Sequence, residues 1–174
     1  MGASEIIKVP VRTRRFVIRR FDGKDLEGYV RFMLDDESTR FLAFTTEQKT
    51  ESGAKALFDQ VIAAYQSRDP IHAYAIADNR TDDYVGSCGW APYEGHIVEC
   101  YYCVNRECQG RGVAVEAMTA FLSGLPVGTE ARAYCHPDNT KAHAVATKCG
   151  MKRLGLRRHR HSKLEGIVFV YSAR

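Results

Sequence analysis

A glycine-rich turn between a predicted strand and a predicted helix limits most strongly what this chain can fold into. Residues 105–124 read NRECQGRGVAVEAMTAFLSG, with Gly110 and Gly112 directly before an apolar run at helical spacing. Glycine lets the backbone approach a ligand closely, and the first turn of a helix offers free N–H groups and the positive end of its dipole. The pattern predicts an anion-binding turn, and an ordinary strand-to-helix turn is the alternative that it leaves open.

Two known glycine motifs do not fit this turn. A nucleotide-binding P-loop ends in Lys followed by Ser or Thr, and no such pair follows these glycines. A dinucleotide-binding fingerprint needs a third small residue where this chain has Val115, and no acidic-ended βαβ unit follows. The prediction that remains is an anion site, here called the glycine loop, made of Gln109, Gly110, Arg111, Gly112, Val113 and Ala114.

Hydrophobic periodicity predicts helices and strands along the whole chain. Strand patterns cover residues 14–21, 72–78, 84–90, 96–104, 130–136, 152–160 and 166–172, and NRTDD and APYEG are predicted hairpin turns. Helical patterns cover residues 22–36, with Asp22 or Asp25 as the cap, and residues 50–67, 113–122 and 140–149, the last closed by Gly150. We therefore expect one α+β domain over residues 1–174, with a mixed, mostly antiparallel central sheet and flanking helices.

The composition fits a compact cytoplasmic domain. At 174 residues, 45% of them hydrophobic, the chain can bury a sizeable core. Its formal charge of +4 gives a mild preference for anionic partners, which suits a phosphate-bearing ligand as well as RNA. No apolar run approaches the roughly 20 residues of a membrane span, and residues 1–10 lack the apolar core of a signal peptide. We expect a cytoplasmic location and no membrane partner.

The six cysteines, at positions 88, 100, 103, 108, 135 and 149, are expected to be reduced thiols that mostly pack in the core. Cys100 and Cys103, with further Cys and His residues in the following segments, raise a zinc site as an alternative. On a strand, however, residues 100 and 103 point to opposite faces. We therefore expect no metal site.

Several segments resemble one family in the right order along the chain. Gln109, Gly112 and Ala114 match the phosphate motif of the GNAT family of N-acetyltransferases. Residues 13–19 are similar to the opening strand of its ribosomal-protein alanine acetyltransferase branch, and residues 99–104 to the central strand. Residues 137–139 and 148–151 match the branch's segment from Asn to Lys-x-Gly-Phe. The resemblance covers most of the chain.

This resemblance implies acetyl-CoA as co-substrate and an amine as acceptor. The pantetheine arm would lie between strands 96–104 and 130–136, which would splay apart, and would bond to main-chain groups near Cys103 and Val104. The pyrophosphate would sit on the amides of the glycine loop. By the same analogy Asn139 would contact the cofactor, although HPDNT also predicts Asn139 as a helix N-cap, and one residue can do both.

Glu99 is the candidate general base, because an alkylammonium acceptor must lose a proton before it attacks a thioester. A solvated or ion-paired strand glutamate is the alternative. The oxyanion would be stabilised by a backbone N–H on the same strand, near Cys103 or Val104. The family's two proton donors are missing, because Ala142 and Ala146 occupy their positions. Tyr134, His136 and His143 lie close enough in sequence to substitute for them, but a packing or surface role is the favoured interpretation of each.

The most basic stretch, residues 152–163, is here called the basic segment. A solvated edge strand, protected from aggregation by charge, is the favoured interpretation, and a contact with RNA or an acidic protein is the other. We expect an N-acetyltransferase acting on a primary amine of a protein N-terminus or a small molecule. The alternative is a non-catalytic acyl-CoA-binding or RNA-contacting module. Nucleic acid is not the expected main partner, and a homodimer through a sheet edge is possible.

Overall fold

A computed structural model describes residues 6–68 and 70–174. The strands are β1 (Val11–Arg12), β2 (Phe16–Arg19), β3 (Ala73–Asp78), β4 (Tyr84–Glu94), β5 (Ile97–Val104), β6 (Glu130–Cys135), β7 (Lys152–Arg158) and β8 (Glu165–Ser172). The α-helices are α1 (Leu26–Leu34), α2 (Asp36–Thr39), α3 (Glu51–Ala64), α4 (Val113–Ser123) and α5 (Thr140–Lys148), and the 3₁₀ helices are η1 (Gly23–Asp25) and η2 (Arg106–Cys108). Residues 1–5, half of the segment used to argue against a signal peptide, lie outside the described residues.

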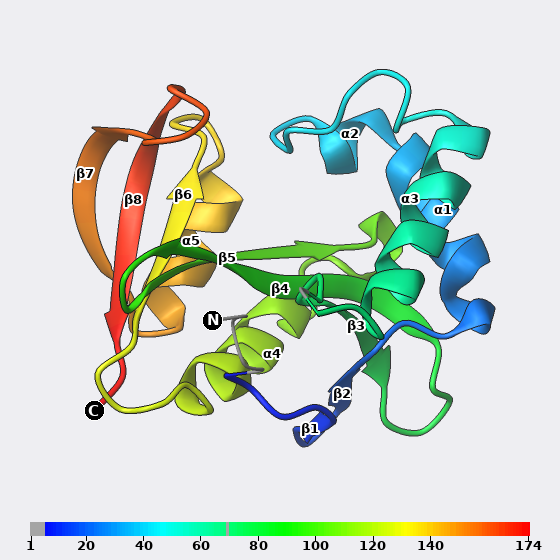
Figure 1. Cartoon of the computed structure of the whole chain (residues 1–174), viewed down its shortest axis with the longest axis horizontal. Helices are drawn as coiled ribbons and strands as arrows, with labels where there is room; N and C mark the ends of the chain where they lie inside the picture. Colours follow the sequence, from blue (N-terminus) through cyan, green and yellow to red (C-terminus); the bar gives the residue numbers. More distant parts are fainter. Residues whose placement is uncertain (1–5, 69) are drawn as a thin grey trace.

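The eight strands form one sheet in the order β1-β2-β3-β4-β5-β6-β8-β7. Every neighbouring pair is antiparallel except β5 and β6, which are parallel. Figure 1 shows β4 and β5 running across the molecule, whereas β6, β8 and β7 stand almost upright beside them. The predicted α+β fold with a mixed, mostly antiparallel sheet and flanking helices is confirmed.

The parallel pair β5–β6 opens after three residues. Its register joins Ile97 to Glu130, Val98 to Ala131 and Glu99 to Arg132, and no later residue of β5 pairs with β6. From residue 100 onward β5 pairs with β4 alone. The two strands that neighbour each other in the middle of the sheet therefore diverge, and one edge of β5 loses its strand partner along residues 100–104.

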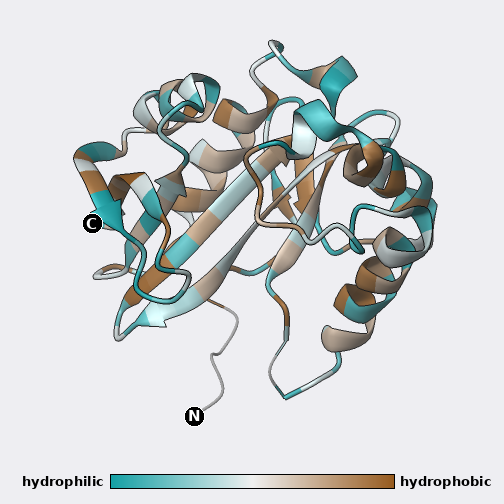
Figure 2. Ribbon diagram, turned by 90° about the horizontal axis from the view of Figure 1, so that it is seen from above, coloured by the Kyte–Doolittle hydropathy of each residue, from teal (hydrophilic) through white to brown (hydrophobic). Residues whose placement is uncertain are grey.

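Helices cover both faces of the sheet, and each face has its own core. Helices α1 and α3 pack Tyr29, Phe32 and Phe58 onto one face. Helix α4 packs Met118 and Phe121 onto the other, together with residues of α5. Figure 2 shows the hydrophobic residues of the strands enclosed between these helical layers. All six cysteines are free thiols; Cys88, Cys100, Cys135 and Cys149 are buried, and Cys103 and Cys108 are half-buried.

The structure corrects four local predictions. The APYEG segment is not a turn, because Ala91–Glu94 continue β4 and the chain turns at Gly95 and His96. The first predicted strand is not half-exposed, since Phe16, Val17 and Ile18 are all buried. Strand β1 and helix α2 were not predicted. Helix α3 ends at Ala64, three residues earlier than the pattern indicated, while Thr50 caps its start as expected.

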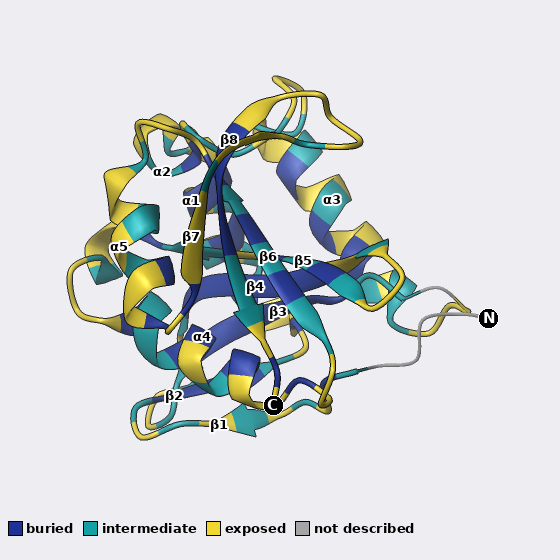
Figure 3. Cartoon of the chain, turned by 90° about the vertical axis from the view of Figure 1, so that its left-hand side faces the viewer, coloured by how far each residue is buried: buried dark blue, intermediate teal, exposed yellow. Residues whose placement is uncertain are grey.

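Strand β7 is an edge strand, as the favoured interpretation of the basic segment predicted. It pairs only with β8, and six of its seven residues are exposed. Figure 3 shows β7 exposed along its length beside the buried β8. Within the described residues, no helix is both long and apolar enough to cross a membrane.

Candidate functional site

The glycine loop lies between β5 and α4, at the end of the strand that diverges from β6. Gly110 and Gly112 have φ angles of +74° and +75°, in the left-handed region that favours glycine. Gly112 is the N-cap of α4, and its lack of a side chain leaves the first turn without a side-chain cap. Gln109 anchors the loop by donating from Nε2 to the Val104 carbonyl at 3.1 Å. The first N–H groups of α4 are thus available to an anion.

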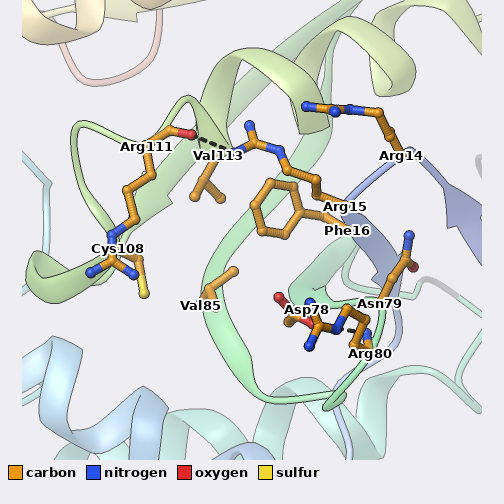
Figure 4. Close-up of a pocket in the computed structure, with 10 residues that line it drawn as sticks. All are labelled: Arg14, Arg15, Phe16, Asp78, Asn79, Arg80, Val85, Cys108, Arg111 and Val113. Atoms are coloured by element: carbon orange, nitrogen blue, oxygen red, sulfur yellow. Dashed lines mark hydrogen bonds between the residues drawn. The ribbon is translucent and has the colours of Figure 1, made fainter.

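Contacts of Thr13 and Arg15 with Glu116 and Arg111, here called the Arg15 clamp, hold the glycine loop against the N-terminal segment. Glu116 in α4 accepts hydrogen bonds from the Thr13 hydroxyl at 2.8 Å, the Arg15 amide at 2.7 Å and Arg15 Nε at 2.6 Å. Arg15 Nη1 then donates to the Arg111 carbonyl at 2.9 Å, the dashed line of Figure 4. Burial opposes ionisation of Glu116, but these hydrogen bonds outweigh it and lower its pKa. The N-terminal segment therefore fixes the loop's backbone.

A cavity of about 290 Å³ opens beside the loop on the β2 and β3 side. Arg14, Arg80 and Arg111 line it and make no ion pair with the described residues, while Phe16 and Val113 supply apolar lining. Figure 4 shows these side chains around the opening, with Arg15 between Arg14 and Arg111. Four arginines and one carboxylate, Asp78, give the lining a net positive charge, which favours phosphate groups near the loop.

Asn139 is the N-cap of α5, and its Oδ1 accepts from the Ala142 amide at 3.1 Å. Lys141 of the same helix reaches back to the glycine loop, with Nζ 3.4 Å from Gln109 Oε1. Ala142 is half-buried and its carbonyl accepts from the Tyr102 hydroxyl at 2.8 Å, whereas Ala146 is fully buried. Neither alanine position can supply a proton.

The residues of β5 divide between the two faces of the sheet. Cys100 belongs to the core beneath α4, whereas Cys103 packs against the core beneath α1 and α3. The pair therefore cannot bind one ion, and within the described chain no three His, Cys, Asp or Glu residues gather as metal ligands. Burial raises the pKa of the Cys103 thiol to about 12, which leaves it protonated at neutral pH.

Glu99 lies where β5 and β6 begin to separate, and its side chain is 34% exposed. Its Oε2 is 2.9 Å from Nε2 of His159, a residue of the basic segment whose side chain is only 12% exposed. No Lys or Arg of the described chain forms an ion pair with Glu99; Arg132, its register partner on β6, pairs with Glu130 instead. Glu99 is therefore a half-exposed carboxylate with one histidine partner.

The three substitute proton donors lie in different surroundings. Tyr134 donates from its hydroxyl to Tyr93 at 3.2 Å and packs its ring edge-on against His159 at 4.6 Å. His136 stacks on Phe41 of the α2–α3 connection at 4.8 Å, and His143 bonds the His136 carbonyl through Nε2 at 3.0 Å. Of the three, only Tyr134 contacts the partner of Glu99.

Three residues of this site were missed by sequence reasoning: Arg15, Glu116 and His159. Arg15 and Glu116 are 101 positions apart, and Glu99 and His159 are 60 positions apart. No spacing pattern signals such pairs, because the sheet topology brings them together. The only available signal for His159 was its position next to arginines, which indicated a solvated strand.

The comparisons with known proteins agree with this geometry. A family model described as the acetyltransferase (GNAT) domain matches residues 15–152. The chain belongs to the GNAT acetyltransferase family. The matched range includes Arg15, Glu116, Glu99 and the whole glycine loop, whereas Thr13, Arg14 and His159 lie outside it.

Individual relatives share sequence or fold with this GNAT chain. The N-acetyltransferase YnaD of Bacillus subtilis (strain 168), itself uncharacterised, is 27% identical over 149 residues, which cover 83% of this chain and 84% of YnaD. The solved GNAT acetyltransferase from Bacillus anthracis has a TM-score of 0.75 at 22% identity, covering 93% of this chain and 97% of its own.

Ribosomal-protein acetyltransferases are among the solved structures that share the fold, in keeping with the predicted branch. The ribosomal-protein-S5-alanine acetyltransferase from Vibrio fischeri has a TM-score of 0.67 at 14% identity, covering 95% of this chain and 97% of its own. RimL, the ribosomal L7/L12 α-N-protein acetyltransferase solved with coenzyme A, has a TM-score of 0.72 at 13% identity and covers the same shares.

Proposed function

We propose that residues 1–174 form one acetyltransferase domain that moves the acetyl group of acetyl-CoA to a primary amine by direct transfer in a ternary complex. The observation that carries the proposal is the glycine loop, with two left-handed glycines ahead of a helix that no side chain caps. A Cβ at Gly112 would lie 3.2 Å from Arg15 Nη2, so a side chain there would disturb the loop and its clamp. This geometry suits a pyrophosphate.

The opening between β5 and β6 supports the position of the pantetheine arm. Along residues 100–104 the edge of β5 that faces β6 has no strand partner, so its main-chain groups can bond to an extended ligand as a strand would. Cys103 and Val104 lie at the end of this edge, next to the loop that would hold the pyrophosphate. Asn139 caps α5 at its start, and by the family analogy it would also contact the cofactor.

The reaction needs few groups from the protein. The neutral amine nitrogen attacks the thioester carbon, a C–N bond forms, the C–S bond breaks, and coenzyme A leaves as a thiolate. The proton that the nitrogen loses on becoming an amide passes through solvent to the thiolate sulfur. A backbone N–H near Cys103 or Val104 would stabilise the oxyanion. Glu99 would accept the proton that the ammonium loses. It precedes Cys103 by four residues, about 13 Å along a strand, so more than one bridging water would carry that proton.

The acceptor is proposed to be a protein α-amine, with small amines as the other class. The support is the exposed basic segment, which runs into the β7–β8 hairpin tip (residues 159–164), where His159 contacts Glu99. Arg157 and Arg158 are exposed and form no ion pair with the described residues, while Arg160 pairs with Glu94 at 2.5 Å. Unpaired positive charge near Glu99, where the acceptor would bind, favours an acidic polypeptide over a polyamine or an amino sugar.

The first experiment is calorimetric titration of the protein with acetyl-CoA, compared with Gly112→Glu. We expect micromolar binding by the wild type and its loss in the folded variant, because a carboxylate enters the proposed pyrophosphate site. A panel of amines and N-terminal peptides then tests transfer. Binding without transfer to any amine would instead identify a non-catalytic acyl-CoA-binding module, and no binding would remove the proposal.

The second experiment tests Glu99. Glu99→Gln should lower kcat by roughly 10²- to 10⁴-fold, the usual contribution of a general base, and should leave the affinity for acetyl-CoA unchanged. Glu37→Gln is the matched control, because Glu37 is an exposed carboxylate on helix α2 and forms no ion pair with the described residues. Equal activity of the two variants would contradict the role of Glu99.

A further inference from the structure

We infer that His159 is a positioning residue for Glu99: a neutral imidazole that donates one hydrogen bond to Oε2 and leaves Oε1 to take the acceptor's proton. The inference rests on the proposed function and goes beyond it by assigning a role to a residue of the basic segment.

The tautomer of His159 follows from its backbone partners. Two amides of the hairpin tip point at Nδ1, from Ser162 at 3.0 Å and from His161 at 3.3 Å. Both are N–H donors, so Nδ1 must present a lone pair. A proton on Nδ1 would be repelled by the protons of the two amide groups that point at it. The ring therefore carries its single proton on Nε2, and the 2.9 Å contact is a hydrogen bond donated to Glu99 Oε2.

The hairpin tip holds the ring in this orientation. The His159 amide donates to the Leu164 carbonyl at 2.7 Å, and the Lys163 amide donates to the His159 carbonyl at 3.0 Å, which closes the turn. Lys163 adopts a φ of +63° to make this turn. The backbone that supplies the two donors to Nδ1 is thus fixed independently of Glu99.

Aromatic rings enclose the imidazole on the β4 and β6 side. Tyr134 and Tyr93 pack edge-on against it at centroid distances of 4.6 Å and 5.3 Å. Tyr93 is itself held, because its hydroxyl accepts from the Arg160 amide at 3.0 Å and from Tyr134 at 3.2 Å. These contacts restrict rotation of the ring, so the Nε2 donor keeps one direction.

The chemical consequence lies in the kind of partner that Glu99 has. An arginine in the place of His159 would neutralise the carboxylate, and several arginines are neighbours of His159 in the sequence. The structure places a neutral donor there instead, while Arg132 is engaged by Glu130 at 2.6 Å. The hydrogen bond fixes Oε2 of a side chain that is still partly exposed, just as hydrogen-bond partners behind metal ligands orient those ligands. The carboxylate is oriented without being neutralised by a permanent cation.

Two substitutions at one position separate orientation from folding. His159→Asn keeps an acceptor near Nδ1 for the two turn amides and removes the donor to Glu99. His159→Gln places an amide N–H donor at about the distance of Nε2, and it loses the hydrogen-bond acceptor for the two turn amides. We expect His159→Asn to lower kcat by about 10- to 100-fold, as the loss of a hydrogen-bond partner behind a metal ligand does, with an unchanged KM for acetyl-CoA. His159→Gln should restore most of that loss.

A double substitution tests whether His159 acts through Glu99. In the Glu99→Gln background, His159→Asn should have no further effect on kcat, because the group that it positions is already absent. A wild-type kcat in His159→Asn, equal losses in the Asn and Gln variants, or a full additive loss in the double variant would each overturn the inference. Thermal unfolding of each variant confirms that it is folded.

Nitrogen NMR of the histidine rings gives a readout that does not depend on turnover. The wild-type protein should show His159 with a protonated Nε2 and an unprotonated Nδ1. A protonated Nδ1, or averaged signals from a freely exchanging ring, would overturn the inference even if the enzyme is active. If the wild type acetylates no amine, the proposed function fails, and this spectrum still decides whether the His159–Glu99 contact exists as described.

Discussion

Alanine at Gly112, compared with alanine at Gly110, tests the glycine loop most sharply. The two glycines have nearly the same backbone conformation, with φ angles of +75° and +74°. A non-glycine residue in the left-handed region costs about 1–2 kcal/mol, so both variants should lose this amount of stability. The surroundings of the two positions differ: a Cβ at Gly110 has no neighbour within 4 Å, whereas one at Gly112 lies 3.2 Å from Arg15 Nη2.

The additional cost at Gly112 follows from that contact. Arg15 must shift, which weakens its 2.9 Å bond to the Arg111 carbonyl, a contribution of roughly 1 kcal/mol. The new methyl group also lies at the first turn of α4, where the pyrophosphate is proposed to bind. Losing one hydrogen bond to a charged group costs about 1.5–3 kcal/mol, and 1.4 kcal/mol is a factor of ten in affinity. Gly112→Ala should therefore bind acetyl-CoA at least about tenfold more weakly than Gly110→Ala.

Calorimetry gives the two dissociation constants, and denaturant unfolding gives the two stabilities. The expected result is a loss of stability about 1 kcal/mol larger in Gly112→Ala than in Gly110→Ala, together with a clearly larger loss of affinity. If the two variants bind acetyl-CoA equally well, the pyrophosphate does not lie on the first turn of α4, and the reasoning from loop geometry to cofactor is wrong.

Three further predictions follow from the contacts described. Because the pKa of Glu116 is lowered below its usual 4.5 in the folded state, the stability that it contributes at neutral pH should be lost as the pH falls through that lowered value. Glu116→Gln should show a smaller loss of stability in acid than the wild type, and identical pH profiles would argue against the clamp. Asp25→Asn should cost about 3 kcal/mol or more, because the 1% exposed carboxylate receives two bonds from Arg19, at 2.7 Å and 2.9 Å. Asp82→Asn, at a 45% exposed partner of Arg19, should cost under about 1 kcal/mol by denaturant unfolding, and equal costs would be inconsistent with burial as the cause. Replacing Arg157 and Arg158 by Gln should raise KM for acidic peptide acceptors more than for neutral ones, with Arg12→Gln on β1 as the control, and an unchanged preference would remove the basic segment from acceptor binding.

Local sequence determined the parts of this protein whose geometry depends on a few neighbouring residues. Gly110 and Gly112 indicated a turn that needs positive φ angles, and Gly150, with a φ of +80°, ends α5 as its position predicted. Thr50 and Asn139 cap α3 and α5 through their own side chains. Backbone conformation and capping act within one helical turn, so a single sequence can reveal them.

Local patterns failed where the sheet overrode them. Pro92 and Gly95 made APYEG resemble a turn, but β4 continues to Glu94 with a register irregularity after Pro92, a place where a strand tolerates proline. Phe16, Val17 and Ile18 are buried together because α4 covers one face of β2 and other parts of the chain cover the other, which alternation with arginine did not indicate.

The tertiary structure alone decided the composition of the proposed site. The sequence identified Glu99 and the glycine loop through local pattern and family resemblance, but it treated Arg15 and His159 as charged surface residues. Sheet order places β2 beside the start of α4 and the β7–β8 hairpin tip beside β5. Contacts over 60 and 101 residues depend on that order and on burial, which no local pattern specifies, so the partners of Glu99 and of the loop became visible only in the fold.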